Sequence, residues 1–398
     1  MSIINYGKIN RKLMIPIFGG IIRLLYRYII DLNPKYEALT NNPFLMSIYT
    51  AIGMTFAFIP FLILKKRIRK IDKNSENRLT LIKIEKSKSF IKYEYYDINK
   101  KTKNHKYKLI FFSTIFDFLE TLLTYCFCKK FIYNFWIFRV LFISIFSYFI
   151  LKIKLYKHQY FSMIIMIILG FGLNIIEYFK SDKKEKSNLI EILIKLIIQA
   201  MASLTYVINK FNMEKNFCTP YEICFWEGGI EVILYIIGLY IINRVGLTIS
   251  DIKHPDNFNE YKRNFDKIDI ILALIHIIIS GIYNVFILLT CDYFTPYHVL
   301  FILIIHQSYY YFKIDENIIF NIIGFFILLL IFFMLLFFIE LLEFNLYGFS
   351  MNTKKNIGIR AMKEHDDNFE VGDFSLDDSQ IEKENIDDEG KNISLKEI

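Results

Sequence analysis

The chain contains about ten apolar stretches, each of roughly 17 to 26 residues, separated by short polar segments. A helix needs about 20 apolar residues to cross the hydrocarbon core of a bilayer, where every backbone N–H and C=O group must be paired internally. Repetition of such stretches predicts an all-α fold, a polytopic transmembrane helix bundle. Composition agrees, because 54% of the 398 residues are hydrophobic, among them 40 Phe and 27 Tyr.

We expect about ten transmembrane helices. Arg23 and Arg27 lie within the first, where a charge at the membrane centre costs about 2.5 to 3.5 kcal/mol, so we expect their side chains to extend toward one membrane interface. No small-residue cleavage site follows Lys12, and we interpret this segment as a retained first helix. The expected spans are 13–30, 43–64, 107–127, 131–151, 159–179, 189–209, 220–242, 268–291, 296–311 and 318–340.

Charge divides the chain into an expected membrane domain and two polar segments. Residues 1–64 hold the first two spans, 65–106 form a basic loop, 107–343 complete a single ten-span domain, and 344–398 form an acidic tail. Segment 65–108 carries 16 Lys or Arg against 5 Asp or Glu. Because Lys and Arg accumulate in cytosolic loops, this excess places the loop in the cytosol, and ten spans then place both termini there as well.

The two polar segments each have two readings. The basic loop could contact anionic lipid headgroups or be a solvated loop that only sets the topology. Residues 352–398 hold 7 Lys or Arg against 13 Asp or Glu with few aromatics, so we expect this tail to be disordered. The tail could recruit cytosolic partners or serve no regulatory role.

Several functional classes lack their sequence motifs. The chain has no Walker loop, no HExxH helix, no GxSxG elbow and no Rossmann glycine fingerprint. Its five cysteines show neither metal-ligand spacing nor a disulfide framework. We therefore expect no cofactor, no metal ion, no nucleic-acid partner and no enzymatic activity; the expected partners are the lipid bilayer and a small-molecule metabolite.

Charged residues inside the spans are the first functional candidates, because lipid offers an isolated charge no partner. Asp117 and Glu120 lie 12 and 9 residues before Lys129, near the turn between the third and fourth spans, and Arg139 lies 10 residues after it. At about 1.5 Å per residue, antiparallel helices place these three side chains at similar depth, which predicts an ion pair. Arg139 either locks two helices together or binds an anionic substrate, and the sequence favours neither reading.

Further polar side chains recur at helical spacing in the later spans. Such stripes either join helices by hydrogen bonds or line a cavity. Glycines beside an intramembrane glutamate allow close helix approach, and a histidine could relay protons or pack in a hydrogen-bonded site. The residues concerned are Lys195, Gln199, Ser203 and Tyr206 in the sixth span; Glu227, Gly228, Gly229 and Glu231 in the seventh; His276, Ser280 and Asn284 in the eighth; and His306 with Gln307 in the ninth.

Four short motifs suggest a family. They are Asn-Pro-Phe-Leu at 42–45, Asp117 followed by Phe-Arg-Val at 138–140, the run 156–160, and Trp-Glu-Gly-Gly at 226–229. In order and spacing, residues 13–342 resemble the drug/metabolite transporter superfamily, most closely the F branch of solute carrier family 35, which is similar to nucleotide-sugar transporters. The resemblance implies that Asp117, Arg139 and Glu227 match polar positions of that branch, and it favours an endomembrane location.

Ten spans divide into two halves of five, and an odd number of spans per half predicts two inverted five-helix repeats. We therefore expect a secondary transporter that moves a small polar or anionic metabolite by alternating access, driven by exchange, a substrate gradient or protons. The alternative is a non-transporting scaffold or adaptor derived from a degenerate carrier, and an intramembrane enzyme ranks third. A monomer and a homodimer both stay open. Candidate substrate-binding residues are Asp117, Glu120, Arg139, Gln199, Tyr206, Glu227, His276, Asn284 and His306.

Overall fold

The structure is a computed structural model that describes residues 4–6, 13–31, 43–74, 100–127, 135–180, 189–216, 218–245, 267–312 and 318–344. The described residues all belong to one compact unit, Met1–Phe344, and a second unit comprises Asn345–Ile398. The predicted acidic tail and residues 75–99 of the predicted basic loop lie outside the described residues.

Each of the ten predicted spans contains helix. The α-helices are α1 (Met14–Asp31), α3 (Pro43–Thr55), α4 (Phe58–Asn74), α6 (Lys100–Phe127), α7 (Arg139–Phe146), α8 (Lys157–Lys180), α9 (Leu189–Lys215), α10 (Pro220–Val245), α12 (Lys267–Tyr293), α13 (Val299–Phe312) and α14 (Ile318–Phe338). Six helical stretches of the described chain are long and apolar enough to cross a membrane, and Met14–Leu25 and Phe135–Leu151 are shorter apolar helices. This pattern is that of a multi-pass membrane protein built as a helix bundle.

The second predicted span is broken rather than continuous. Helix α3 ends at Thr55 and α4 begins at Phe58, with a turn between them. Pro60 has no N–H to donate to the Phe56 carbonyl, and its ring would clash with that carbonyl in a regular helix. Helix α4 then continues to Asn74, and α6 begins at Lys100, so both ends of the predicted basic loop are helical.

The fourth span changes its helical pitch twice. A 3₁₀-helix, η2 (Phe135–Phe138), leads into α7, and a π-helical turn, η3 (Ser147–Leu151), follows it. Lys152 then adopts a left-handed conformation with φ of 58° and ends the helix. Arg139 is the first residue of α7, directly at the change from the tighter to the wider helix. A second 3₁₀-helix, η5 (Pro296–His298), opens α13 in a similar way.

One element departs from the predicted all-α fold. Strands β1 (Ile4–Tyr6) and β2 (Leu342–Phe344) form a two-stranded antiparallel sheet, with Asn5 opposite Glu343. This pair joins the segment before the first helix to the segment after the last one. The backbone N–H and C=O groups of these two segments are thereby paired with each other. The chain therefore enters the first helix and leaves the last helix at the same place.

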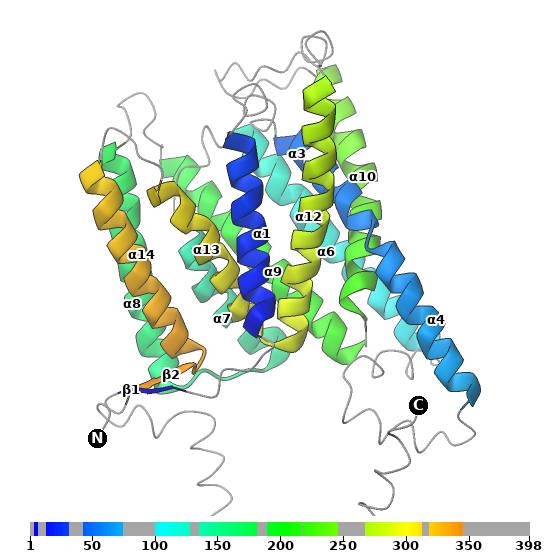
Figure 1. Cartoon of the computed structure of the whole chain (residues 1–398), viewed down its shortest axis with the longest axis horizontal. Coiled ribbons are helices and arrows are strands. Elements are labelled where there is room, and N and C mark those ends of the chain that lie inside the picture. Colours follow the sequence, from blue (N-terminus) through cyan, green and yellow to red (C-terminus); the bar gives the residue numbers. More distant parts are fainter. Residues whose placement is uncertain are drawn as a thin grey trace, which may run out of the picture. The chain divides into compact units, whose positions relative to one another are not determined.

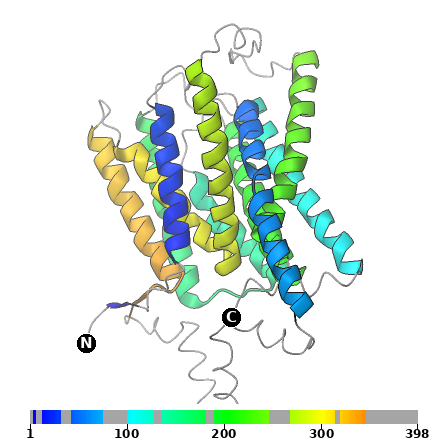
Figure 2. The same ribbon diagram turned by 45° about the vertical axis from the view of Figure 1, so that its right-hand side comes forward.

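The helices pack in a regular pattern (Figure 1). Helix α3 packs against α10 and α12, and α8 packs against α14, a pair that stays at one edge of the bundle in both views (Figures 1 and 2). Helix α6 packs against α9 and α10, α7 against α9, and α1 against α12 and α13. Glycines permit the closest crossings, because a Cβ on Gly53 would meet the backbone of Ile277 and Gly281 across the α3–α12 contact.

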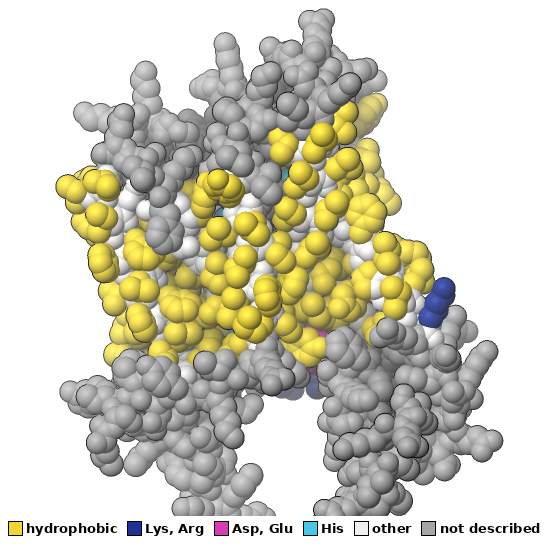
Figure 3. Space-filling model, viewed as in Figure 1, with side chains coloured by type: hydrophobic (Ala, Val, Ile, Leu, Met, Phe, Trp, Pro, Cys, Tyr) yellow, Lys and Arg dark blue, Asp and Glu magenta, His cyan; other side chains and the backbone are white. Residues whose placement is uncertain are grey.

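The outer face of the bundle is hydrophobic (Figure 3). Large apolar side chains that a soluble protein would bury are exposed along the helices, for example Phe149 (72%), Phe179 (69%) and Ile319 (68%). The polar side chains Ser113, Ser203 and Glu227 are instead buried between helices. Apolar side chains facing outward and polar ones facing inward are what a surrounding lipid solvent requires.

Candidate functional site

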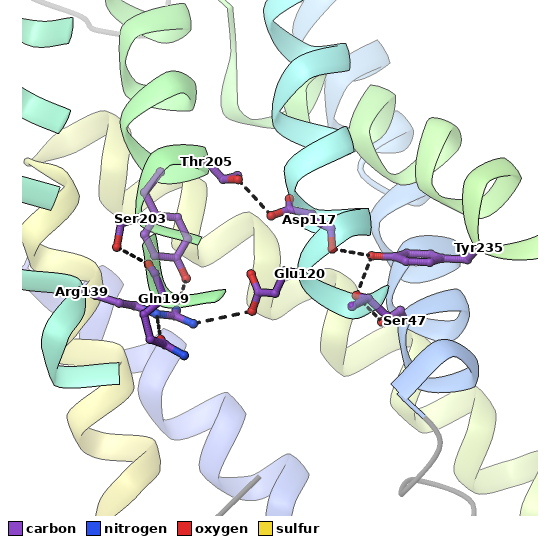
Figure 4. Close-up of polar contacts among 10 residues, drawn as sticks. Ser47, Asp117, Glu120, Arg139, Gln199, Ser203, Thr205 and Tyr235 are labelled. Atoms are coloured by element: carbon purple, nitrogen blue, oxygen red, sulfur yellow. Dashed lines mark hydrogen bonds and ion pairs between the residues drawn. The ribbon is translucent and has the colours of Figure 1, made fainter. Parts of the chain in front are cut away.

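Arg139 lies at the centre of a polar cluster formed by α6, α7 and α9 (Figure 4). Its Nε donates a hydrogen bond to Gln199 Oε1 at 2.6 Å, and its Nη1 donates to the Tyr206 hydroxyl at 2.9 Å. Its Nη2 lies 3.8 Å from Glu120 Oε1. The predicted ion pair between the third and fourth spans is therefore present for Glu120, and two residues of the predicted sixth-span stripe complete the shell around the guanidinium.

Asp117 lies one turn before Thr121 on α6 and contacts two other helices. Its carboxylate accepts a hydrogen bond from the Thr205 hydroxyl of α9 at 3.0 Å, and its backbone carbonyl accepts one from the Tyr235 hydroxyl of α10 at 3.5 Å. The Tyr235 hydroxyl also contacts the Thr121 hydroxyl at 3.1 Å. Asp117 is thus bonded to α9 rather than to Arg139, and the stripe Asp117–Thr121 joins α6 to α10.

Glu227 finds its partners on two neighbouring helices. Its Oε1 accepts hydrogen bonds from Ser113 Oγ of α6 at 2.6 Å and from Asn209 Nδ2 of α9 at 2.9 Å. The neighbouring glycines differ from each other: a Cβ on Gly228 would lie 2.6 Å from Met54 Cβ of α3, whereas a Cβ on Gly229 would have no atom within 4 Å. Of these two glycines, Gly228 is therefore the one that allows α10 to approach α3 closely.

The charged pair at the centre of the cluster is only partly shielded. The side chains of Arg139 and Glu120 are 12% and 28% exposed, although both face other helices of the bundle. A guanidinium offers several N–H donors in a planar fork that suits carboxylate and phosphate groups. Because Glu120 contacts Arg139 at 3.8 Å, beyond a short hydrogen bond, an anion could displace it and take over the same charge.

A second group of polar residues lies on α1, α12 and α13. His276 Nε2 contacts the Thr50 hydroxyl of α3 at 3.3 Å, and His306 packs edge-on against Tyr310 with ring centroids 5.7 Å apart. Asn284 and Ser280 each donate a hydrogen bond to a carbonyl of their own helix, α12. Of the nine predicted site residues, Glu120, Gln199 and Tyr206 contact Arg139 directly, whereas the contacts described for Asp117, Glu227, His276, Asn284 and His306 are with other residues.

The arginines of the first helix lie over aromatic rings of two neighbouring helices, and their extension toward a membrane interface stays a prediction. The Arg23 guanidinium lies 4.9 Å from the ring centre of Tyr283 on α12, and that of Arg27 lies 5.6 Å from the ring centre of Tyr310 on α13. Cations over aromatic rings gain electrostatic energy that is larger away from water. Packing of α1 against α12 and α13 thus directs both side chains into the bundle.

Sequence reasoning did not select Thr205 or Tyr235, and it named Glu231 among the polar groups of the seventh span without including it in the predicted site. Glu231 carries a recognisable signal, because it lies one turn after Glu227 on α10 and belongs to the same helix face. Lys195, by contrast, pairs with Glu191 of its own helix at 2.8 Å.

Metal ligands do not gather in the part of the chain that the structure describes: no group of three or more His, Cys, Asp or Glu side chains there could hold a metal ion. No protein-family model matches the chain, and no curated protein matches it. The cluster around Arg139 must therefore be interpreted from its own chemistry.

Proposed function

We infer that the chain is a secondary transporter that moves a small polar or anionic metabolite by alternating access. The observation that carries this proposal is the partly exposed Arg139, held among three helices by Gln199, Tyr206 and Glu120. A guanidinium inside a membrane bundle is costly unless it has partners, and intramembrane charges commonly mark substrate pathways. Arg139 would bind the anionic group of the substrate, and Glu120 would neutralise Arg139 in the empty state.

The helix contacts support two related halves of five spans. If the spans of α1 to α8 form one half and those of α9 to α14 the other, each major contact has a counterpart at the equivalent position. The α6–α9 contact corresponds to α12–α1, α7–α9 to α13–α1, and α3–α12 to α10–α6. The contacts α3–α10 and α8–α14 each join equivalent helices of the two halves. Contacts that recur when each helix is replaced by its equivalent in the other half are expected of inverted repeats, with the binding site between the two halves.

The same architecture supports ten crossings with both ends on one side. The β1–β2 pair brings the segments before α1 and after α14 together, as an even number of crossings requires. With the basic segment 65–108 in the cytosol, both ends would be cytosolic. These features agree with a drug/metabolite-transporter-like carrier, for which we propose an endomembrane location.

A ligand-dependent stability screen of the purified full-length protein tests the proposal. A ligand that binds only the folded state raises the apparent melting temperature by mass action. We expect a saturable increase with one class among nucleotide sugars, nucleotides, amino acids, short peptides and organic cations, and uptake of that class into proteoliposomes. Arg139→Ala should lower uptake more than it lowers the amount of folded protein.

Two control variants separate binding from folding. Arg139→Lys keeps the charge but loses the planar fork, so the ligand-induced shift should shrink while the protein stays folded. Lys154→Ala removes an exposed cation between η3 and α8 and should leave the shift unchanged. No shift across the whole panel with well-folded protein would reject the carrier and favour the scaffold. Equal losses of uptake and folded protein in Arg139→Ala would make Arg139 purely structural.

A further inference from the structure

Helices α6 and α10 run in parallel with a fixed register. Ser113 of α6 donates a hydrogen bond to Glu227 of α10, and Thr121 of α6 contacts Tyr235 of α10; each pair is separated by 114 positions. The two contacts lie two turns apart on both helices, so the register is the same at both ends of the contact. Residues between them on the same faces must therefore follow the same offset.

The register places two acidic residues at the same level on adjacent helices. Asp117 lies midway between Ser113 and Thr121, and the position 114 residues later is Glu231, midway between Glu227 and Tyr235. Glu231 is 5% exposed and, among the residues that the structure describes, makes no hydrogen bond or ion pair. Asp117 is only half-buried and accepts the Thr205 hydroxyl. Glu231, which is buried and makes no hydrogen bond with the described residues, thus lies level with Asp117, which is more accessible and close enough to act on it electrostatically.

The surroundings contain too few cations to neutralise these carboxyl groups. Two further acids lie nearby, Glu227 on α10 and Glu120 on α6, while the guanidinium that acts on Asp117, that of Arg139 on α7, is already paired with Glu120. The remaining neighbours from the packed helices bring hydroxyl, thiol or amide groups: Ser47 from α3, Thr205 and Asn209 from α9, and Cys224 and Tyr235 from α10.

Two carboxylates that share a site away from water do not both ionise, because each charge raises the energy of the other. Either a cation or a proton must neutralise the pair. A metal ion needs several ligands, and no group of three or more suitable side chains occurs among the described residues. A proton needs only one carboxylate oxygen and can be shared by two.

We propose that Asp117 and Glu231 form a proton-binding pair that couples proton movement to the transport cycle. The proton reaches Asp117 from water on its accessible side and is held between the two carboxyl groups; deprotonation returns it to water and leaves one more negative charge in the cluster. Glu120 and Arg139 lie within the same cluster, so a change of that charge alters how firmly Arg139 holds its counter-ion. The coupling role rests on the proposed transport function, whereas proton binding itself does not.

Infrared spectroscopy of the purified full-length protein in lipid tests proton binding directly. Exposed carboxyl groups are already ionised at neutral pH. A protonated-carboxyl C=O band that is present in neutral buffer and disappears in alkaline buffer therefore comes from a buried acid. We expect the wild-type protein to show this band and Glu231→Gln to lose it. Asp117→Asn removes the other half of the pair and should lose it too, which keeps the test valid if one variant folds poorly.

Glu227→Gln is the matched control, because it lies one turn before Glu231 and keeps the oxygen that accepts from Ser113 and Asn209. This variant should keep the band. Absence of the band in the wild-type protein would overturn the proposal, as would its persistence in both pair variants or its loss in Glu227→Gln. Failure to transport any solute would reject the proposed function while leaving the band in place, so the two failures can be told apart.

Discussion

Two polar regions inside the bundle hold side chains of opposite character, with carboxyl groups in one and two arginines in the other. One, the acidic region, consists of Asp117, Glu120, Glu227 and Glu231 on α6 and α10; the other, the basic region, consists of Arg23, Arg27, His276 and His306 on α1, α12 and α13. In the acidic region, Glu227 and Asp117 accept hydrogen bonds of 2.6 to 3.0 Å from hydroxyl and amide groups. In the basic region, the arginines lie over tyrosine rings.

The difference teaches how one bundle can hold charges of both signs without pairing them all directly. Directional hydrogen bonds fix a carboxylate, whereas the face of a ring attracts a cation over a broad range of positions. Arg139 combines both kinds of contact, because it donates hydrogen bonds to Gln199 and Tyr206 and its guanidinium also lies 5.7 Å from the centre of the Tyr206 ring. The hydrogen bonds fix its position beside the acidic region, as a ring contact alone would not.

The helix between the two regions should be the most sensitive to substitution. Helix α3 contacts α10 of the acidic region and α12 of the basic region, and a Cβ on Gly53 would meet backbone atoms of Ile277 and Gly281. Since backbone cannot move aside as a side chain can, we expect Gly53→Ala to cost about 3 kcal/mol or more of unfolding free energy. Thermal unfolding in detergent measures the loss.

Gly229→Ala provides the control for this prediction. A Cβ at Gly229 would meet no atom within 4 Å. Alanine also favours helix over glycine by about 1 kcal/mol, so this variant should be neutral or slightly stabilised. Equal melting temperatures for the two variants would show that the α3–α12 crossing is not tightly packed.

The next largest effect should separate the two arginines. Arg139→Ala removes hydrogen bonds to Gln199 and Tyr206 and leaves Glu120 without its counter-ion, which we expect to cost about 1.5 to 3 kcal/mol. Arg23→Ala removes a cation–π contact worth about 0.5 to 2 kcal/mol. Unfolding of both variants, followed side by side, should show the larger loss for Arg139→Ala, and the reverse order would contradict the distinction.

Glu227 should follow in size. Glu227→Leu removes the acceptor shared by Ser113 and Asn209 and leaves both donors unpaired inside the bundle, at a cost of about 1 to 3 kcal/mol. Glu227→Gln keeps an acceptor oxygen of the same shape and should cost much less. Comparison of the two melting temperatures isolates the hydrogen bonds from the shape of the side chain, and similar losses would assign the effect to shape or charge.

Much of the fold follows from the sequence because the membrane imposes it. Length and apolar composition located helix in each of the ten expected spans, since a backbone in lipid has few alternatives. The break at Phe56–Ala57 was missed because hydropathy averages over Pro60, and the change of pitch before Arg139 has no hydropathy signal at all. The β1–β2 pair joins segments about 340 residues apart, which no local pattern can reveal.

Prediction of the site succeeded where the contact was local. Arg139 and Glu120 belong to adjacent spans, so counting residues from the turn was enough to predict their ion pair. Glu231 opposite Asp117 requires the register of two helices far apart in sequence, and only the contacts at Ser113 and Thr121 supply it. The contact of Arg23 with Tyr283 could not be predicted, because the sequence does not place α12 beside the first helix.

The smallest predicted effect comes from the same chemical change made once in each region. Thr205→Val removes the 3.0 Å hydrogen bond to the Asp117 carboxylate, and Thr50→Val removes the 3.3 Å contact with His276 Nε2. His276 keeps a hydrogen bond involving the backbone of Met46, so Thr50→Val should lower the free energy of unfolding by only about 0.5 kcal/mol. In Thr205→Val the Asp117 carboxylate loses its hydrogen bond from the threonine hydroxyl, and the free energy of unfolding should fall by about 1 to 1.5 kcal/mol.

Valine has nearly the shape of threonine, so the difference between the two variants isolates the hydroxyl group. Chemical unfolding with both variants in the same detergent should resolve the order even when each change is small. A larger loss for Thr50→Val would mean that the basic region depends on directional hydrogen bonds more than the acidic region does. The greater importance of hydroxyl hydrogen bonds in the acidic region would then have to be abandoned, because His276 would depend on Thr50 more than Asp117 depends on Thr205.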